Sequence, residues 1–397
     1  MAEGPSAGGR ILHLFSNHKV TGPAELALET ARALASAGAD ARFFSSDPRK
    51  TRYRDRWLQL LARERGMPEE EIPGVRLPKH IHPVRVLFDV RRLAAHLRRD
   101  PPAVIHCHLP GDHYVAWRAL RSGGLEIPLV RTLYDGEPPR PKRRNRQTLE
   151  SATRLICYSR AVADALLADS SYQLDPERVL VLPPPVDTER FDPARAGVAP
   201  RREALEVPAE AVCVGIVARM QTHRRFEVLL EAFRRAAEAE ARLHLVIVGR
   251  GTNQETVARQ PVRELGLEDR VHFAGYVSGP DYVNTLASFD AKVFMVPGSD
   301  GTCRAVREAL AMGLPVITTR RGMLPELVRH EQDGLVVGDE VDDLPDELIH
   351  SHRIQPDRQV HRVFVGRGRG VWYAARKVEH VSRVQHDLAR GFAVVGC

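Results

Sequence analysis

Two carboxylates beside a turn are the first residues of this chain that suit chemistry. Asp300 and Glu308 have seven residues between them and flank the start of a periodic helix, which follows a hydrophobic strand at 291–296. Free N–H groups at such a helix start, with the positive end of the helix dipole, form an anion site, typically for phosphate. The pattern therefore predicts carboxylates that bind hydroxyl groups on both sides of a diphosphate. In the alternative interpretation, Asp300 caps the helix and Glu308 lies on the solvated surface.

A cluster of cations indicates the same kind of ligand. Arg219, His223, Arg224 and Arg225 stand within seven positions, directly after a hydrophobic strand at 212–217. In open α/β sheets, ligands bind at the carboxyl ends of the strands. Because crowded cations repel one another, we expect an anionic ligand between them, with plain surface charge as the alternative.

Alternating strands and helices must position these residues. Hydrophobic runs indicate buried parallel strands, and amphipathic stretches between them indicate helices, which predicts two Rossmann-like halves. A chain of 397 residues fits two such domains, and prolines before Arg195 predict a linker, so we expect domains at 1–195 and 196–340. The tail at 341–397 lacks periodicity and indicates either divergence or a shifted reading frame. Strands are expected at 11–15, 104–107, 129–133, 154–159, 212–217, 243–248, 271–274 and 291–296, and a helix at 90–97.

Composition and charge limit the class of protein. The formal net charge of +7 and the pI near 9.3 favour an anionic partner. The sequence shows neither a signal peptide nor an apolar run of about 18 residues, which predicts a soluble cytoplasmic protein. The five cysteines are scattered without the spacing of metal ligands and suit a reduced protein.

A run of basic residues, Arg140, Lys142, Arg143, Arg144 and Arg146, is expected in a proline-containing loop. Most such runs are only solvated, and the alternative is docking on anionic lipid or on an acidic acceptor. Nucleic acid is disfavoured because aromatic residues do not alternate with these charges.

Two histidines end one of the expected strands. His106 and His108 form a His-x-His pattern, and Tyr134 follows the next expected strand. No third ligand follows at a convincing spacing, so we expect these histidines to pack or to line a cleft and expect no metal site.

These features resemble the retaining glycosyltransferases of the GT-B fold, in particular family four, and the resemblance covers residues 10–338. Residues 180–193 resemble the family's hinge. Two positions depart from the pattern, because Asp300 replaces a usual Glu and Cys303 stands where Gly is usual. After the two carboxylates, the match continues with Ala309, Ala311, Gly313, Pro315, Val316, Glu326, Leu327, Val328 and the run 333–337.

The resemblance implies an α/β GT-B protein, with two doubly wound Rossmann-like domains that face a central cleft, and it implies roles for single residues. Arg219 and Arg224 match the Arg and the Lys of a Lys-Gly pair that grip the donor's β-phosphate. Glu308 would accept hydrogen bonds from the ribose and Asp300 from the donor sugar. The remaining donor-binding residues would be Gly251, Tyr276, Val277, Gly301, Thr302, Cys303 and Arg304. The acceptor or sugar side would hold Gly22, His108 and Tyr134, the last at a place where the family often has His.

The implied activity is retaining transfer of a sugar, of the hexosyltransferase type, from a nucleoside diphosphate sugar to an acceptor hydroxyl. The acceptor would be a glycan, a lipid-linked glycan or a cell-envelope polysaccharide. We expect a metal-independent enzyme without a bound cofactor, with peripheral contact to anionic membrane and no nucleic acid partner. The alternatives are a nucleotide-sugar epimerase, a phosphorylase, or a GT-B protein that binds a nucleotide sugar without transferring it. A dehydrogenase is disfavoured because the first loop lacks Gly-x-Gly-x-x-Gly.

Overall fold

The computed structural model describes residues 9–46, 58–77, 83–297, 301–338, 340–353 and 372–373. The chain forms two compact units: residues 1–185 with 364–397 are here called unit 1, and residues 186–363 are called unit 2. The linker expected near Arg195 therefore falls inside unit 2. Most of the tail that was expected to be atypical lies outside the described residues. Among the helices of the described ranges, none has the length and apolar character needed to cross a bilayer.

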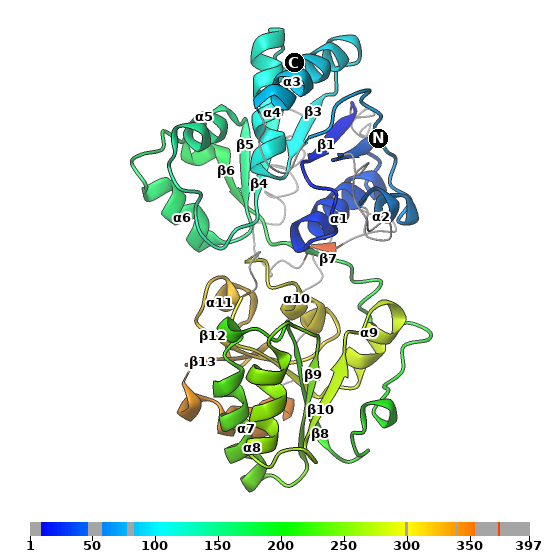
Figure 1. The fold of residues 1–397 in the computed structure, drawn as a ribbon, viewed down its shortest axis with the longest axis vertical. Coiled ribbons are helices and arrows are strands. Elements are labelled where there is room, and N and C mark those ends of the chain that lie inside the picture. Colours follow the sequence, from blue (N-terminus) through cyan, green and yellow to red (C-terminus); the bar gives the residue numbers. More distant parts are fainter. Residues whose placement is uncertain are drawn as a thin grey trace, which may run out of the picture. The chain divides into compact units, whose positions relative to one another are not determined.

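Unit 1 contains a six-stranded parallel sheet flanked by helices (Figure 1). The strand order is β2-β1-β3-β4-β5-β6, and Ile11 of β1 pairs with Ala41 on one side and with Val104 on the other. The strands are β1 (Ile11–Phe15), β2 (Ala41–Ser45), β3 (Val104–Cys107), β4 (Leu129–Leu133), β5 (Arg154–Cys157) and β6 (Val179–Val181). The helices are α1 (Gly22–Ser36), α2 (Leu58–Glu64), α3 (Pro83–Arg99), α4 (Pro110–Gly123), α5 (Arg143–Ser151) and α6 (Arg160–Ala168), and β7 (Pro185–Val186) pairs with β14 (Trp372–Tyr373).

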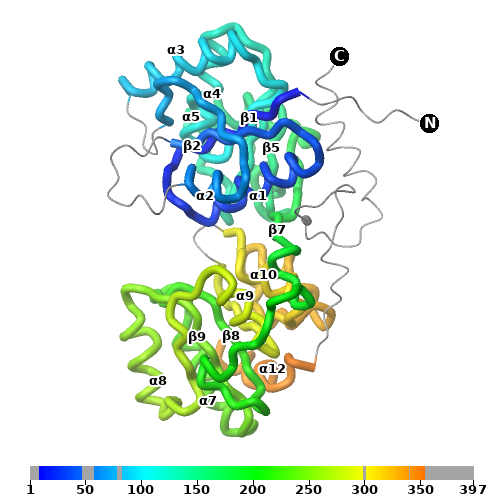
Figure 2. Tube along the Cα trace, turned by 90° about the vertical axis from the view of Figure 1, so that its right-hand side faces the viewer, coloured from blue at the N-terminus to red at the C-terminus, as the bar shows by residue number. Residues whose placement is uncertain are grey.

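Both faces of this sheet are buried, because successive side chains of a strand point to opposite faces. Leu14 of β1 packs with α3 and α4, whereas its neighbour Phe15 packs with α1 and α2. Figure 2 shows α3 and α4 side by side and α1 and α2 as a separate pair. The result is a three-layer core in which β1 and β3 are adjacent strands inside the sheet.

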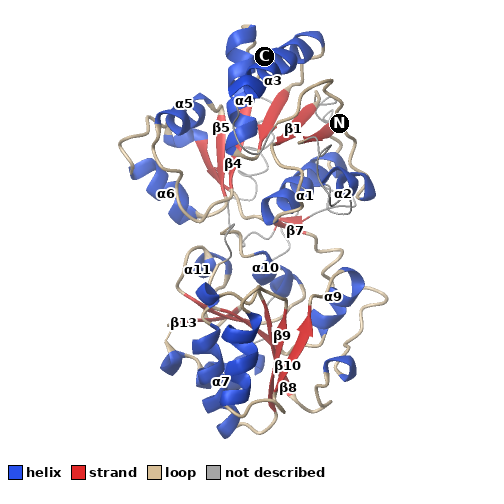
Figure 3. Cartoon of the chain, in the orientation of Figure 1, coloured by secondary structure: helices blue, strands red, loops and turns tan. Residues whose placement is uncertain are grey.

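Unit 2 repeats the plan with strand order β10-β9-β8-β11-β12-β13, again all parallel. Figure 3 shows its strands between helices. Phe226, Leu229 and Phe233 of α7 lie three and four residues apart, on one helix face, and pack with Leu245 and Ile247 of the sheet. The strands are β8 (Val212–Val217), β9 (Leu243–Val248), β10 (Val271–Gly275), β11 (Ala291–Phe294), β12 (Val316–Thr319) and β13 (Gly334–Val337). The helices are α7 (Phe226–Ala239), α8 (Gln260–Glu264), α9 (Gly279–Ala287), α10 (Arg304–Ala311), α11 (Leu324–Leu327) and α12 (Pro345–His350).

The winding of each sheet reverses at one place. The chain leaves β1 for β2 on one side and then crosses to β3 on the other, and it treats β8, β9 and β11 in the same way. At such a switch point the connections after the two adjacent strands diverge, and in open α/β sheets ligands bind there, at the carboxyl ends of the strands. The α/β class and the two Rossmann-like units predicted from the sequence are confirmed.

Four local expectations differ from the structure. The strand expected at 154–159 ends at Cys157, and the strand expected at 291–296 ends at Phe294. The helix expected at 90–97 is α3 and begins seven residues earlier, at Pro83, because proline suits the first helical position. The basic run expected in a loop lies partly in α5, which begins at Arg143, so Arg143, Arg144 and Arg146 are helical. The prolines of that segment precede the helix and do not interrupt it.

Candidate functional site

Arg224 lies where the winding of the unit 2 sheet reverses. The chain leaves β8 and ends a short 3₁₀ turn (η4, Thr222–Arg224) at this residue. Its Nη1 donates a hydrogen bond of 2.7 Å to the carbonyl oxygen of Val296, in the loop between β11 and α10. Its guanidinium also lies 5.7 Å from the centre of the Phe294 ring. One arginine therefore joins the loops that follow the two strands at the switch point.

The start of α10 has an unusual backbone. Its N-cap residue, Cys303, adopts φ 47° and ψ 42°, the left-handed region that favours glycine. A residue with a Cβ pays about 1–2 kcal/mol there. This explains why Gly is usual at this position in the family that the sequence resembles. Buried neighbours hold the loop, since Thr302 is fully buried and its carbonyl accepts a hydrogen bond of 3.1 Å from Nε of Arg307.

A second helix begins in the same way beside Arg224. Arg225, the next residue, is the N-cap of α7 and has φ 57° and ψ 40°. It stands where the family pattern has the Gly of its Lys-Gly pair. Helices α7 and α10 follow the adjacent strands β8 and β11, so both helix starts lie at the switch point. Their first N–H groups and dipoles provide positive potential at this place.

Glu308 is buried inside this arrangement and is not a solvated surface residue. It lies in α10 with 5% of its surface exposed. Its Oε2 accepts a hydrogen bond of 2.6 Å from the hydroxyl of Tyr282 in α9, and Nε of Arg304 lies 3.5 Å from Oε1. The carboxylate is thereby held in one orientation, which suits a group that accepts hydrogen bonds from ligand hydroxyls.

Lys292 supports α10 from the sheet. This residue of β11 is completely buried, and its Nζ donates a hydrogen bond of 2.6 Å to the carbonyl oxygen of Ala305 in the first turn of α10. Burial lowers the pKa of Lys292 to about 7, while the nearby Glu308 carboxylate acts in the opposite direction. Sequence reasoning missed Lys292 and Tyr282, because the group that each of them contacts lies in α10, a different element.

The loop after β9 packs closely against the loop after β8. A Cβ on Gly251 would lie 2.1 Å from the carbonyl oxygen of Met220, so the Gly-x-Gly segment permits a close approach of two backbones. Tyr276 follows β10 and is 66% exposed, with the guanidinium of Arg250 4.8 Å from its ring centre. Val277, the next residue, is half-buried. This exposed pair lies just beyond the carboxyl ends of β9 and β10.

The remaining residues predicted to bind the donor differ in exposure and in their contacts. Arg219 is exposed, and no side-chain partner for it exists among the described residues, so no contact joins it to Arg224. Asp300 falls outside the described residues, and its role stays a prediction. Gly301 and Thr302 are buried in the loop that leads to α10, whereas Arg304 is exposed.

Three histidines gather in the core of unit 1. His13, His106 and His108 are buried, and one ring nitrogen of each lies within 4.8 Å of the others. His108 bonds through Nε2 to Nδ1 of His13 at 3.0 Å and through Nδ1 to the hydroxyl of Tyr134 at 2.6 Å. Burial lowers the pKa of His13 to about 3 and lowers the pKa of His106 and His108 well below the ordinary value. His108 thus packs beneath Tyr134, which is itself buried.

A buried carboxylate joins the two loops at the switch point of unit 1. Asp112 of α4 accepts hydrogen bonds from the N–H of Ser16 after β1 at 2.8 Å and from the N–H of His108 after β3 at 3.0 Å. Nη1 of the buried Arg131 lies 3.7 Å from Asp112 Oδ1. Burial raises the pKa of Asp112 to about 6, against the nearby guanidinium. Arg131 also lowers the pKa of the adjacent histidines, and the same positive charge would oppose a metal cation there.

Two further features of unit 1 lie near β1 and β2. Gly22 is the first residue of α1, and the Thr21 side chain caps that helix.

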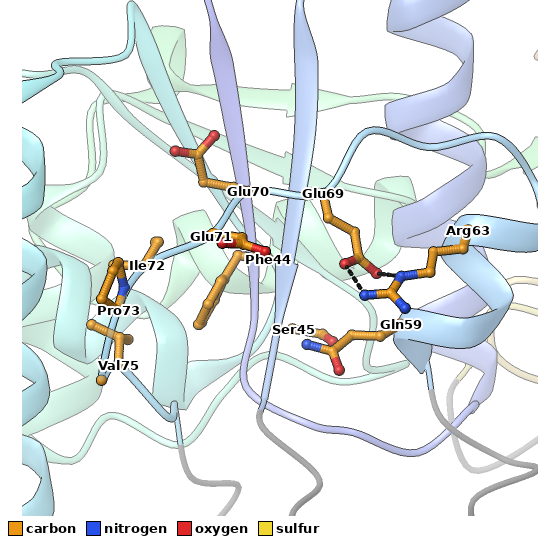
Figure 4. A pocket seen from close by; sticks show the side chains of 11 residues that line it. Phe44, Ser45, Gln59, Arg63, Glu69, Glu70, Glu71, Ile72, Pro73 and Val75 are labelled. Atoms are coloured by element: carbon orange, nitrogen blue, oxygen red, sulfur yellow. Dashed lines mark hydrogen bonds and ion pairs between the residues drawn. The ribbon is translucent and has the colours of Figure 1, made fainter.

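A cavity of about 380 Å³ lies elsewhere, beside β2 and α2 (Figure 4). Its lining includes Glu69, Glu70 and Glu71, with Glu69 2.9 Å from Arg63. Three carboxylates repel a diphosphate, so this cavity does not suit the predicted ligand.

Family models match both units. The model described as Glycosyltransferase Family 4 matches residues 20–190, and the model described as Glycosyl transferases group 1 matches residues 211–353. The D-inositol 3-phosphate glycosyltransferase of Actinosynnema mirum is 31% identical over 309 residues, which cover 71% of this chain and 70% of that protein. The chain belongs to glycosyltransferase family 4.

Other similar proteins agree with this family. The D-inositol 3-phosphate glycosyltransferase of Saccharomonospora viridis is 33% identical over 257 residues, but the match spans only 58% of its length and 59% of this chain. Anabaena HepE, solved in complex with UDP, is 19% identical with a TM-score of 0.67 and covers 85% of this chain and 88% of its own. At that identity the likeness establishes the fold, which is GT-B.

The left-handed backbone at Cys303 leads to a prediction for this family 4 chain. We expect the free energy of unfolding of Cys303→Gly to exceed that of Cys303→Ala by about 1 kcal/mol. Both variants lose the thiol, but only glycine relieves the backbone strain. The three tryptophans, Trp57, Trp117 and Trp372, all belong to unit 1. Tryptophan fluorescence therefore follows the unfolding of unit 1 alone, whereas far-UV circular dichroism follows both units. In urea unfolding, a change seen by circular dichroism but not by fluorescence reports unit 2. Equal stability of the two variants would contradict a strained position 303.

The buried histidines lead to a prediction about pH. Their folded pKa values lie below the unfolded value near 6.5, so the unfolded chain binds more protons between pH 6.5 and about 3. The stability of unit 1 should therefore fall on acidification through this range, by up to about 1.4 kcal/mol per pH unit for each histidine. His113 is buried with a lowered pKa as well and acts in the same direction. Asp112 and Asp89 act oppositely, since burial raises their folded pKa values, but they are two groups against four.

The measurement is urea unfolding by tryptophan fluorescence at several pH values, for the wild type and for His13→Gln. The variant should lose less stability on acidification than the wild type. Parallel pH curves would show that His13 is not excluded from protonation in the folded state.

Proposed function

We propose that this chain transfers a sugar from a nucleoside diphosphate sugar to an acceptor hydroxyl, with the donor bound at the carboxyl ends of β8 and β11 in unit 2. The observation that supports it most directly is the hydrogen bond from Arg224 to Val296, beside the start of α10, with Glu308 buried in the same helix. Family membership supports the same proposal, in which a cation, two helix starts and an oriented carboxylate bind one donor. A diphosphate with attached sugars carries the matching charges and hydroxyls.

In the proposed reaction, the acceptor oxygen forms a bond to the anomeric carbon while the bond from that carbon to the diphosphate oxygen breaks. The acceptor's proton passes to the departing diphosphate on the same face, which retains the anomeric configuration. Arg224, Arg219 and the helix start at α10 oppose the negative charge that develops on the leaving group. Preorganised donors of this kind typically contribute about 3 kcal/mol each in the transition state. These fixed positive groups serve where other enzymes use a divalent cation, so we propose metal-independent transfer.

The exposed pair Arg250 and Tyr276 is proposed to carry the nucleotide base. An aromatic ring at the carboxyl end of the sheet, with a guanidinium 4.8 Å from its centre, offers a flat surface on which a base can stack. HepE was solved with UDP and with UDP-glucose, so uridine diphosphate hexoses are the first donors to try. Because the relatives are named for D-inositol 3-phosphate, a polyol phosphate is the first acceptor to try, beside lipid-linked glycans.

The test is a screen of nucleotide sugars by thermal shift, followed by turnover of any donor that binds. Arg224→Gln and Glu308→Gln should each lose most of the donor-induced shift, and Arg224→Gln should lower kcat/KM about a hundredfold. Arg242→Gln is the matched control, because Arg242 is exposed and precedes β9, at the opposite end of the sheet. The proposal fails if the Arg224 and Arg242 variants behave alike. Isomerisation of the donor without any acceptor would instead indicate an epimerase.

A further inference from the structure

One face of α3 is exposed and amphipathic along its length. Its core side carries Val90, Leu93 and Leu97, whereas the side chains at 84, 87, 88, 91, 92, 98 and 99 remain exposed. Ala95 is exposed as well, so positions such as 84, 88, 92, 95 and 99 follow one another at spacings of three or four residues and share one stripe of the helix. Figures 1 and 2 show α3 at the outside of unit 1, beside α4. We call this stripe the α3 face.

The first half of the α3 face is apolar. Val84 is 57% exposed, Leu87 46% and Phe88 48%, and these are three of the five large hydrophobic side chains that the described residues expose. They occupy two consecutive turns, so they form one patch instead of scattered single contacts. Such a patch normally marks a surface that binds a protein or a membrane.

The second half of the α3 face is cationic. Arg91, Arg92, Arg98 and Arg99 follow the apolar patch, and Arg85 lies within its turns. The guanidinium of Arg92 lies 5.6 Å from the centre of the Phe88 ring, which brings charge directly against the apolar patch. Neither Arg91 nor Arg99 has a carboxylate partner among the described residues. This exposed, uncompensated charge favours an anionic partner over a neutral or cationic one.

Acidic groups near the α3 face are already occupied. Asp89 is buried on the other side of the helix and accepts the N–H groups of Arg76 and Leu77. Asp100, just after the helix, bonds to Arg10. Nη2 of Arg98 donates to the carbonyl oxygen of Gly123 at the end of α4, where Arg121 adds another exposed cation. The positive surface therefore continues from α3 onto α4.

We propose that the α3 face docks unit 1 on an anionic lipid bilayer. Val84, Leu87 and Phe88 would enter the region between headgroups and acyl chains, while the arginines bind lipid phosphates. This is the composition of helices that lie in the plane of the interface, with an apolar patch beside Lys or Arg. A second copy of this chain would bring like charges together, so the cations favour lipid. The proposal concerns unit 1 alone and does not depend on the donor site of unit 2.

The experiment is co-sedimentation of the full chain with vesicles of phosphatidylcholine alone and with phosphatidylglycerol added. We expect binding only to the anionic vesicles, and weaker binding as salt is raised. Leu87→Ser/Phe88→Ser should abolish most binding. Arg91→Gln/Arg99→Gln should weaken it about 25-fold, since each arginine near an anionic surface is worth about a fivefold change.

Two matched variants separate the α3 face from charge in general. Arg242→Gln/Arg263→Gln removes the same charge from exposed positions of unit 2 and should bind as the wild type does. Arg143→Gln/Arg146→Gln removes it from α5, the basic run singled out in the sequence, and should retain most binding. Circular dichroism melting checks that each variant is folded. The proposal is overturned if the wild type ignores anionic vesicles, or if either matched variant loses as much binding as the α3 variants.

Discussion

The candidate site of unit 2 depends on one hydrogen bond, from Arg224 to Val296, which joins the loops after β8 and β11 where the winding of the sheet reverses. Without a tie, the loops after β8 and β11 would be free to separate, because their chains leave the sheet in opposite directions. The Arg224 guanidinium and the Val296 carbonyl provide that tie. A guanidinium carries five donors in a fixed fork, so it can bond to the backbone and still keep its full positive charge. The same side chain can therefore shape the crevice and contribute to its charge.

In each unit, a charged side chain bonds to the backbone near the switch point of the sheet, but the two side chains carry opposite charges. In unit 1, Asp112 accepts backbone N–H groups from the loops after β1 and β3. In unit 2, Arg224 donates to a backbone carbonyl. The Asp112 carboxylate occupies N–H groups that could otherwise bind an anion. The Arg224 guanidinium bonds to a carbonyl oxygen, so the helix starts at Arg225 and Cys303 still supply positive potential. This difference fits an anionic donor at unit 2 and a different kind of ligand at unit 1.

The sequence predicted the fold well where burial decides the structure, and it missed residues whose partners are distant in the chain. Continuous hydrophobic runs located strands such as 11–15 and 243–248 to the residue, since both faces of those strands are buried. The start of α3 was missed because its exposed Val84, Leu87 and Phe88 break the amphipathic pattern. Tyr282, Lys292 and Asp112 carry no local signal, because their importance lies in bonds to other elements. The departure at Cys303 was visible in the sequence, but only the backbone angles give its physical reason.

The most direct measurement is a crystal structure of the chain with a bound nucleoside diphosphate. The distal phosphate should lie within hydrogen-bonding distance of the Arg224 guanidinium and of the first N–H groups of α10, with a ribose hydroxyl on the Glu308 carboxylate. A diphosphate bound elsewhere, for example beside the carboxylates of the unit 1 cavity, would contradict the assignment, as would an Arg224 side chain that points into solvent.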